Sequence, residues 1–140
     1  MADLGVFGNA IKGGLDALVL RQRVISNNIA NIDTPGFRAS EVQFEDKLQA
    51  AMQNHQGHAA SLSLDTTAPG HIAAESAGGM QVDPTVTTSS AFTLRTDGNN
   101  VDIEQQMLDL SRTAIQFSAL TRVAAMKASL LNTVATDGRR

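Results

Sequence analysis

The sequence contains no cysteine, no tryptophan and no tyrosine among its 140 residues. The absence of cysteine excludes a disulfide framework and thiolate chemistry, and it suits a chain that passes between redox compartments. Only five phenylalanines are present, although aromatic side chains supply much of the apolar area of compact cores. We therefore expect long helices that pack through aliphatic side chains rather than a tight globular core.

Long apolar runs and strong net charge are also missing. No stretch of about 18 consecutive apolar residues occurs, so we expect no membrane-spanning segment. The N-terminal residues lack a basic region followed by an apolar one, so we expect no cleaved secretory signal peptide. The formal net charge is −3 and the 11 lysines and arginines are scattered, so we expect no nucleic-acid partner.

Residue patterns that carry catalysis or bind cofactors do not occur in this sequence. It has no Walker A motif, no dinucleotide-binding glycine pattern and no Gly-x-Ser-x-Gly nucleophile motif. His55, His58 and His71 lie in a stretch rich in glycine, alanine and serine, which does not hold metal ligands rigidly. We therefore expect no metal site, no cofactor and no enzyme activity.

Two apolar stripes, one near each end of the chain, have the spacing of helices. Alternating steps of four and three residues are typical of a helix that packs through one seam. The stripes predict one helix over about residues 4–32 and a second over about 103–136. The predicted seam consists of Leu4, Ile11, Leu15, Leu18, Ile25, Ile29 and Ile32 in the first helix, and of Ile103, Met107, Leu110, Phe117 and Leu131 in the second.

The two predicted helices differ in their local stability. Asp102 is a favourable N-cap for the second helix, and Gln105 three residues later completes a capping-box pattern. In the first helix, Gly8, Gly13 and Gly14 each cost about 1 kcal/mol relative to alanine. Further apolar residues lie outside both seams, which indicates surface for additional partners. Periodicity alone is equally compatible with an ordinary helix pair inside a globular domain.

The segment from Ser26 to Phe37 reads Ser-Asn-Asn-Ile-Ala-Asn-Ile-Asp-Thr-Pro-Gly-Phe and predicts that the first helix ends near Ile32–Asp33. Asparagine side chains compete for helix backbone groups, and they can bond either the last carbonyls of the helix or a neighbouring backbone. Pro35 and Gly36 suit the second and third positions of a type II turn. Phe37 then follows as an apolar anchor. An asparagine-rich cap without a further role is the simpler alternative.

The middle of the chain, residues 38–100, is a predicted linker or insertion between the two parts of a discontinuous helical domain, residues 1–37 and 101–140. Within it we expect a short helix near 41–53 and a short strand or hairpin near 86–97. Residues 54–90 are poor in large apolar side chains, and we expect this part to be a mobile insertion. The predicted fold class is thus mainly α, with two long terminal helices packed as a coiled coil, a flexible middle segment and a possible short β-hairpin.

The segment after the first apolar stripe resembles the N-terminal signature of bacterial flagellar axial proteins, which are the rod, hook and hook-associated subunits. A second stretch, from Asp97 to Ser111, is similar to the pattern of proximal-rod subunits. The chain has Thr-Pro-Gly-Phe where longer distal-rod and hook relatives commonly have Thr-Thr-Gly-Phe, and the resemblance does not extend to roughly 54–90. The matching signature residues are Asn27, Asn28, Ala30, Asn31, Thr34, Pro35, Gly36 and Phe37.

This resemblance implies a structural subunit of the proximal rod in the periplasmic part of the flagellar basal body, which assembles helically through its terminal helices and transmits torque. The implied partners are other copies of the chain, other rod subunits, the adaptor between the rod and the MS ring, and the flagellar type III export gate. Phe44 and Leu48 match the Phe-x-x-x-apolar motif that related subunits present to that gate, and Phe7 and Ile11 match it equally well. The alternatives are a different rod subunit and a soluble helical-hairpin adaptor or chaperone.

Overall fold

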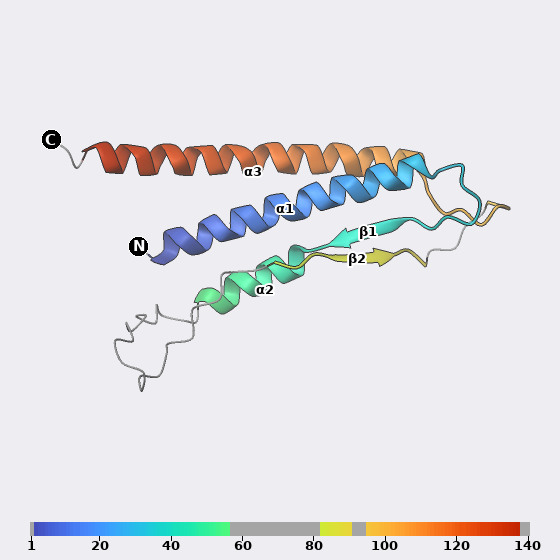
Figure 1. Ribbon diagram of the computed structural model, residues 1–140, viewed down its shortest axis with the longest axis horizontal. Coiled ribbons are helices and arrows are strands. Elements are labelled where there is room, and N and C mark those ends of the chain that lie inside the picture. Colours follow the sequence, from blue (N-terminus) through green and yellow to red (C-terminus); the bar gives the residue numbers. More distant parts are fainter. Residues whose placement is uncertain (1, 57–81, 91–94, 138–140) are drawn as a thin grey trace, which may run out of the picture.

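The computed structural model describes residues 2–56, 82–90 and 95–137. The elements follow one another as α1 (Ala2–Ala30), β1 (Ser40–Gln43), α2 (Glu45–Gln56), β2 (Thr85–Thr88) and α3 (Ile103–Asp137). α1 and α3 run antiparallel along an elongated molecule, so the start of α1 and the end of α3 lie at the same end (Figure 1). These two packed terminal helices and the small sheet confirm the predicted mainly α fold. None of the described helices is both long and apolar enough to cross a membrane.

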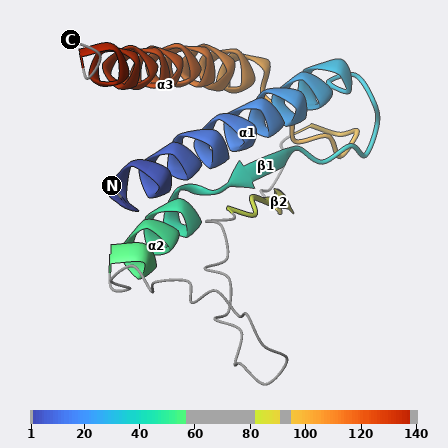
Figure 2. The same cartoon turned by 60° about the vertical axis from the view of Figure 1, so that its left-hand side comes forward.

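α1 is the central layer of the structure. α3 packs on one side of α1, while β1, β2 and α2 lie on the other side (Figures 1 and 2). The core sits on the second side, where Ala17, Leu18, Val42 and Phe44 are buried together. Because α1 contributes residues to contacts on both sides, most of its apolar surface is used within the chain.

Two glycines of α1 lie where neighbouring elements approach the helix closely. A Cβ atom at Gly14 would lie 3.0 Å from Cδ2 of Leu120 in α3 and 4.0 Å from Cδ2 of Leu48 in α2. A Cβ atom at Gly13 would lie 3.0 Å from a methyl carbon of Val82. The loss of helix propensity at these glycines is therefore offset by closer packing on both sides of α1.

The turn after α1 has the geometry that Pro35 and Gly36 predict. Gly36 has a positive φ of 72°, and the N–H of Phe37 donates to the carbonyl of Thr34 over 3.3 Å. Both features are those of a type II turn with glycine in its third position. The α-helix itself ends at Ala30, slightly before the predicted end.

α3 begins at the predicted cap. The carboxylate of Asp102 accepts the backbone N–H groups of Glu104 at 2.9 Å and of Gln105 at 3.4 Å. The side chain of Gln105 does not return to the cap residue, as a complete capping box requires. It donates instead to both carboxylate oxygens of Asp109, over 3.1 and 3.2 Å. Only the first half of the capping box is therefore formed.

The small sheet joins two segments that are distant in the sequence. β1 pairs antiparallel with β2, with Ser40 opposite Thr88 and Gln43 opposite Thr85. The strand expected near residues 86–97 is thus present from Thr85, but its partner is the segment before α2 rather than the segment that follows. Residues 91–94 lie outside the described part of the chain.

The helix expected near residues 41–53 starts later, at Glu45. Val42 and Phe44 are buried while Gln43 between them is exposed, which is the alternation of a strand rather than of a helix. Residues 57–81, with His58 and His71, fall outside the described residues, and so does most of the insertion expected over 54–90.

We predict that Gly14→Leu destabilises the fold. The new side chain would have to fit between Leu120 and Leu48, and overpacking of this kind costs about 1–3 kcal/mol, which exceeds the gain in helix propensity of under about 1 kcal/mol. Urea denaturation followed by circular dichroism measures the change. Gln22→Leu, at an exposed position of α1, is the matched control; equal stability of the two variants would contradict the close contact.

Candidate assembly site

The signature segment after α1 meets the segment that leads into α3, and Asn99 joins them. Asn99 is fully buried. Its side-chain amide donates to the carbonyls of Asn31 at 3.0 Å and of Ile32 and Thr34 at 2.9 Å. Its Oδ1 accepts the N–H of Val101 at 2.8 Å. One side chain therefore pairs carbonyls that the end of a helix leaves free and orders the entry to α3.

Backbone contacts complete this junction, which we call the turn bracket (residues 31–36 and 97–101). The N–H of Gly36 donates to the carbonyl of Asp97 at 2.8 Å. Gly98 has a positive φ of 76°, and a Cβ atom there would lie 3.8 Å from Cα of Gly36. The carboxylate of Asp97 accepts the N–H of Asn99 and pairs with Arg95. These two interactions hold the pKa of Asp97 below its usual value.

Asn28 holds three elements together. It is fully buried in α1, and its amide donates to the carbonyl of Ser40 in β1 and to Oε1 of Gln106 in α3, both at 2.8 Å. Its Oδ1 accepts the N–H of Ser40 at 3.0 Å. The side chain thus pairs with the strand as another strand would. The hydrogen bonds of Asn28 run to a neighbouring backbone, which was one of the two alternatives that the sequence left open.

The other signature asparagines act locally. The amide of Asn31 donates to the carbonyl of Asn27 at 2.8 Å and to its Oδ1 at 3.0 Å. The hydroxyl of Thr34 donates to Oδ1 of Asn31 at 3.2 Å. These bonds close the end of α1, as the cap interpretation expects. Ala30 and Pro35 are exposed and Phe37 is half-buried.

Asn100 ties the sheet to the entry of α3. Its Oδ1 accepts the N–H of Ala39 at 2.7 Å, and its amide donates to the carbonyl of Ser89 at 3.4 Å. Sequence reasoning did not single out Asn99 or Asn100. Their place in the sequence was the one indication of a structural role, since these two consecutive asparagines stand between Asp97-Gly98 and the cap residue Asp102.

Phe44 and Leu48, the predicted export-gate pair, lie inside the fold. Phe44 is buried and Leu48 is half-buried. Cζ of Arg21 lies 4.6 Å from the centre of the Phe44 ring, and the same guanidinium donates to the carbonyl of Val42 at 2.7 Å and pairs with Glu45 at 2.7 Å. In the folded chain, Arg21 therefore covers the aromatic ring.

The other pair that matches the export motif, Phe7 and Ile11, has one exposed and one buried side chain. Phe7 is exposed, with Nζ of Lys127 lying 5.2 Å from its ring centre, whereas Ile11 is buried. Neither pair thus presents both of its side chains on the surface of the folded chain.

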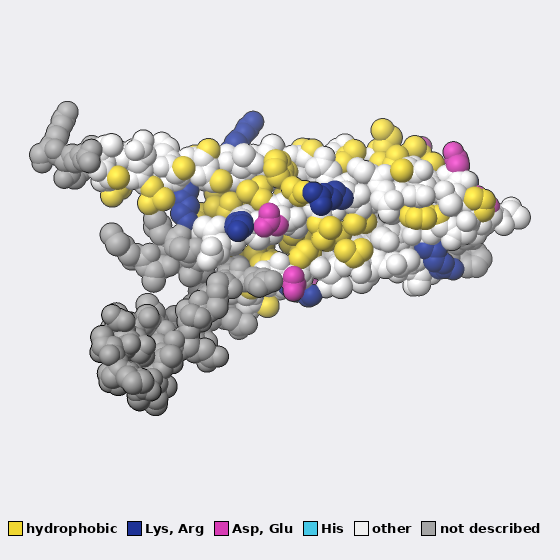
Figure 3. Space-filling model, in the orientation of Figure 1, with side chains coloured by type: hydrophobic (Ala, Val, Ile, Leu, Met, Phe, Trp, Pro, Cys, Tyr) yellow, Lys and Arg dark blue, Asp and Glu magenta, His cyan; other side chains and the backbone are white. Residues whose placement is uncertain are grey.

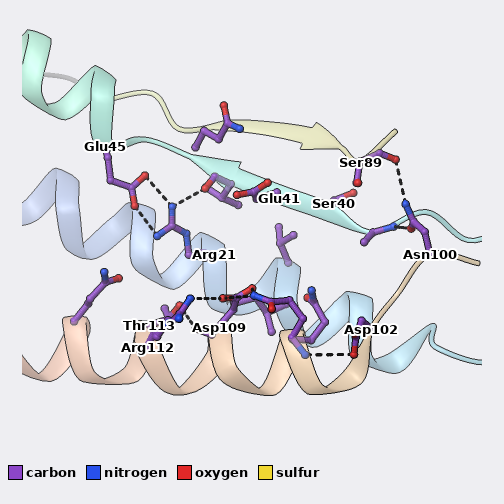
Figure 4. Close-up of a pocket in the computed structure, with 18 residues that line it drawn as sticks. Arg21, Ser40, Glu41, Glu45, Ser89, Asn100, Asp102, Asp109, Arg112 and Thr113 are labelled. Atoms are coloured by element: carbon purple, nitrogen blue, oxygen red, sulfur yellow. Dashed lines mark hydrogen bonds and ion pairs between the residues drawn. The ribbon is translucent and has the colours of Figure 1, made fainter. Parts of the chain in front are cut away.

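A groove of about 580 Å³ lies between β1 and the first half of α3, with α1 as its floor (Figure 4). Four of its charged side chains are engaged with one another, since Arg21 pairs with Glu45 and Arg112 lies 3.6 Å from Asp109. Among the described residues, no three potential metal ligands lie together. The groove is thus a gap between packed elements, and its polar groups include those that hold β1 against α1.

The seam predicted on the first helix faces inward. Leu4 lies in the first turn of α1. The buried members are Ile11, Leu18 and Ile25, and the half-buried members are Leu15, Ile29 and Ile32.

The seam predicted on the second helix lies mostly on the surface of the single chain. Met107 is 58% exposed, Ile103 and Leu131 are each 44% exposed and Phe117 is 39% exposed, while Leu110 is half-buried. Hydrophobic side chains are accordingly visible along the length of α3 (Figure 3). This seam therefore has little intrachain contact.

Polar residues explain why α3 is rotated relative to that seam. Gln106 and Thr113 turn toward the interior, where Gln106 accepts the amide of Asn28 and the hydroxyl of Thr113 donates to the carbonyl of Asp109 at 2.7 Å. With these bonds made, neither group is buried without a partner. Sequence periodicity gave no indication that these two polar residues face α1.

We predict that Asn99→Ala strongly destabilises the fold. The substitution leaves the carbonyl of Ile32 and the N–H of Val101 without partners, at a cost of about 1–3 kcal/mol for each group that stays buried. The carbonyls of Asn31 and Thr34 keep the backbone N–H groups of Thr34 and Phe37. Chemical denaturation gives the loss. Asn27→Ala removes an exposed asparagine from the same junction and should cost less than about 1 kcal/mol; similar losses for the two variants would contradict the turn bracket.

We also predict an acid-dependent contribution from Glu45. Burial raises the pKa of this carboxyl, but hydrogen bonds from Arg21 and from backbone N–H groups, together with the charge of Arg21, bring the pKa below its ordinary value of 4.5. The stabilisation is therefore complete above about pH 4.5 and is lost as the pH falls through the lower folded value. Because the carboxylate is largely exposed, the effect should stay below about 1 kcal/mol.

The measurement is the free energy of unfolding as a function of pH for the wild-type chain and for Glu45→Gln. Asp97 and the other carboxyls titrate in both proteins, so the difference between the two curves isolates Glu45. Parallel curves below pH 4.5 would show that the Arg21 pair contributes nothing.

The first part of the turn bracket, residues 31–36, lies within a segment that matches known proteins. Residues 10–38 match the family described as "Flagella basal body rod protein". The flagellar basal body rod protein FlgB of Borrelia hermsii is 38% identical over 124 residues, which cover 86% of this chain and 88% of the relative. The FlgB proteins of Borreliella burgdorferi and Bacillus subtilis are 35% and 29% identical over 86% and 92% of this chain. The chain therefore belongs to the FlgB family of flagellar basal body rod proteins.

Proposed function

We propose that this protein is a structural subunit of the proximal rod of the bacterial flagellar basal body, and that it assembles helically through α1 and α3. The exposed apolar surface of α3 is the observation that carries the proposal. A helix with apolar residues on several sides is buried on several sides, and among the described elements α1 is the one that α3 packs against extensively. Neighbouring subunits of the rod provide the remaining cover.

The exposed apolar surface of α3 also determines which kind of assembly we propose. A contact between two different patches on identical subunits repeats without closing and generates a helical array. Met107 on one face of α3 and Leu108 on another are both largely exposed, so each copy can meet neighbours in more than one direction. We propose other copies of the chain and other rod subunits as these neighbours.

The turn bracket suits a subunit under torsional load. Residues 1–37 and 101–140 act as one helical unit in this proposal, because buried hydrogen bonds from Asn28 and Asn99 fix α1 and α3 to each other. Buried, fully paired polar networks hold one arrangement and resist sliding. Torque applied to α3 is thereby passed to α1 and onward to the adjoining subunits, which include the adaptor between the rod and the MS ring.

Export through the flagellar type III gate completes the proposed route to the periplasmic rod. Phe44 and Leu48 are the proposed gate contacts, and both are engaged in the fold. The gate would therefore read them only in an unfolded chain. The lack of cysteine leaves such a chain without oxidisable thiols on its way.

We predict that Met107→Asp prevents rod assembly without unfolding the chain. The new charge would lie in an apolar contact between subunits, and each 1.4 kcal/mol of lost contact energy lowers occupancy about tenfold. The variant is expressed in cells that lack their own copy, and the assay measures swimming together with the amount of chain in purified basal bodies. Circular dichroism of the purified variant verifies its helices.

Gln49→Asp, which adds the same charge at an exposed position of α2, is the matched control and should leave rods and swimming normal. Normal basal bodies with Met107→Asp would show that this face of α3 is not an assembly surface. A chain that never enters basal bodies, even as wild type, would favour a soluble adaptor or chaperone instead.

A further inference from the structure

A second exposed stripe runs along α3 on a side that α1 does not cover. Steps of four and seven residues place its members on one helix face. Its apolar members are Leu108, Ile115 and Met126, which are 45%, 69% and 65% exposed. Its charged members are Glu104 and Arg122, both exposed. We call these five residues the outer stripe.

The charges of α3 are unevenly distributed along its axis. Asp102, Glu104 and Asp109 lie at or near its start, together with Arg112. Residues 113–136 contain Arg122 and Lys127 and no acidic residue, and Asp137 ends the helix. The helix dipole favours cations only in the last turn, where α3 has none, so the dipole does not account for Arg122. Within the part of the chain that the structure describes, neither Glu104 nor Arg122 forms an ion pair.

The outer stripe matches itself after a shift of 18 residues. Such a shift is five helical turns, or about 27 Å along the axis, so it returns every side chain to the same face. It brings Glu104 of one helix beside Arg122 of another and Leu108 beside Met126, while Ile115 lies beside Thr133. We propose that two copies of this chain contact each other through parallel α3 helices staggered by this distance.

The opposite orientation does not satisfy the same residues. If two antiparallel α3 helices placed Glu104 opposite Arg122, Leu108 would lie opposite Ser118 rather than opposite an apolar side chain. Ile115 would then lie opposite Ser111 as well. The parallel arrangement alone matches the charges together with two of the three apolar residues. Because the two copies then contribute different patches, the contact is heterologous and repeats along an axis.

This inference rests on the proposed function and names the neighbour and the register of one of its contacts. Glu104 and Leu108 form the patch of one copy, and Arg122 and Met126 form the patch of the next. Each copy keeps one of its two patches free for a further copy.

Cross-linking tests the register directly, because the natural chain has no cysteine. Leu108→Cys and Met126→Cys are prepared as separate full-length chains, each with the helical content of the wild type. The two are mixed at high protein concentration with a short bis-maleimide cross-linker. We expect a linked dimer in the mixture and at least about tenfold less in either variant alone.

Several results would overturn the inference. A dimer formed by either variant alone indicates unstaggered parallel helices or a two-fold contact, and a dimer between Leu108→Cys and Ser118→Cys indicates the antiparallel arrangement. Absence of any dimer in the mixture excludes the contact between copies and leaves a different rod subunit as the neighbour. If the wild-type chain enters basal bodies but the two cysteine variants form no linked dimer, the register is refuted and the proposed function is not.

Charge exchange adds an independent readout in the same assay. Glu104→Arg and Arg122→Glu, each placed in both cysteine chains, should lower the yield of linked dimer about tenfold, because like charges then face each other. The double variant restores the pair with its signs exchanged and should recover the yield. Equal yields in all four backgrounds would show that these charges do not meet.

Discussion

The buried amide of Asn99 is the interaction on which the arrangement of the two long helices depends. The end of a helix leaves carbonyls without partners, and burying them unpaired is costly. Asn99 supplies donors to Asn31, Ile32 and Thr34, so the end of α1 can be buried against the entry to α3. Because that entry is fixed, the antiparallel register of the helices is fixed as well, and Gly14 comes to lie against Leu120.

The exposure of α3 follows from this topology rather than from an excess of apolar residues. α1 lies between α3 and the layer of β1, β2 and α2, and it is covered from two sides (Figure 2). α3 belongs to an outer layer and has α1 as its partner. Residues such as Ile115 and Met126 therefore stay on the surface of a single chain however well the core is packed. In the proposed assembly, the second cover for α3 comes from another chain.

Local chemistry was predictable from the sequence, and contacts between distant segments were not. Pro35 and Gly36 determine a type II turn by their own φ preferences, and Asp102 caps the backbone two and three residues ahead. Asn99 looks like any loop asparagine until the fold brings three carbonyls to it. The face of α3 that meets α1 was assigned by apolar spacing, but the hydrogen bond between Asn28 and Gln106 turns a polar residue inward, so the seam lies on the neighbouring face.

The two exposed faces of α3 determine what kind of structure its copies can build. Met107 and Leu108 are consecutive, so their side chains point about 100° apart around the helix. α1 covers a third side of α3. In the proposed assembly each α3 therefore has neighbours on several sides and forms part of a layer of helices rather than a single row. In the proposed contact between copies, Glu104 near one end of α3 and Arg122 farther along give neighbouring helices of that layer a common direction. A tubular rod requires both properties, lateral contacts in more than one direction and a uniform polarity, and one helix of this chain supplies them.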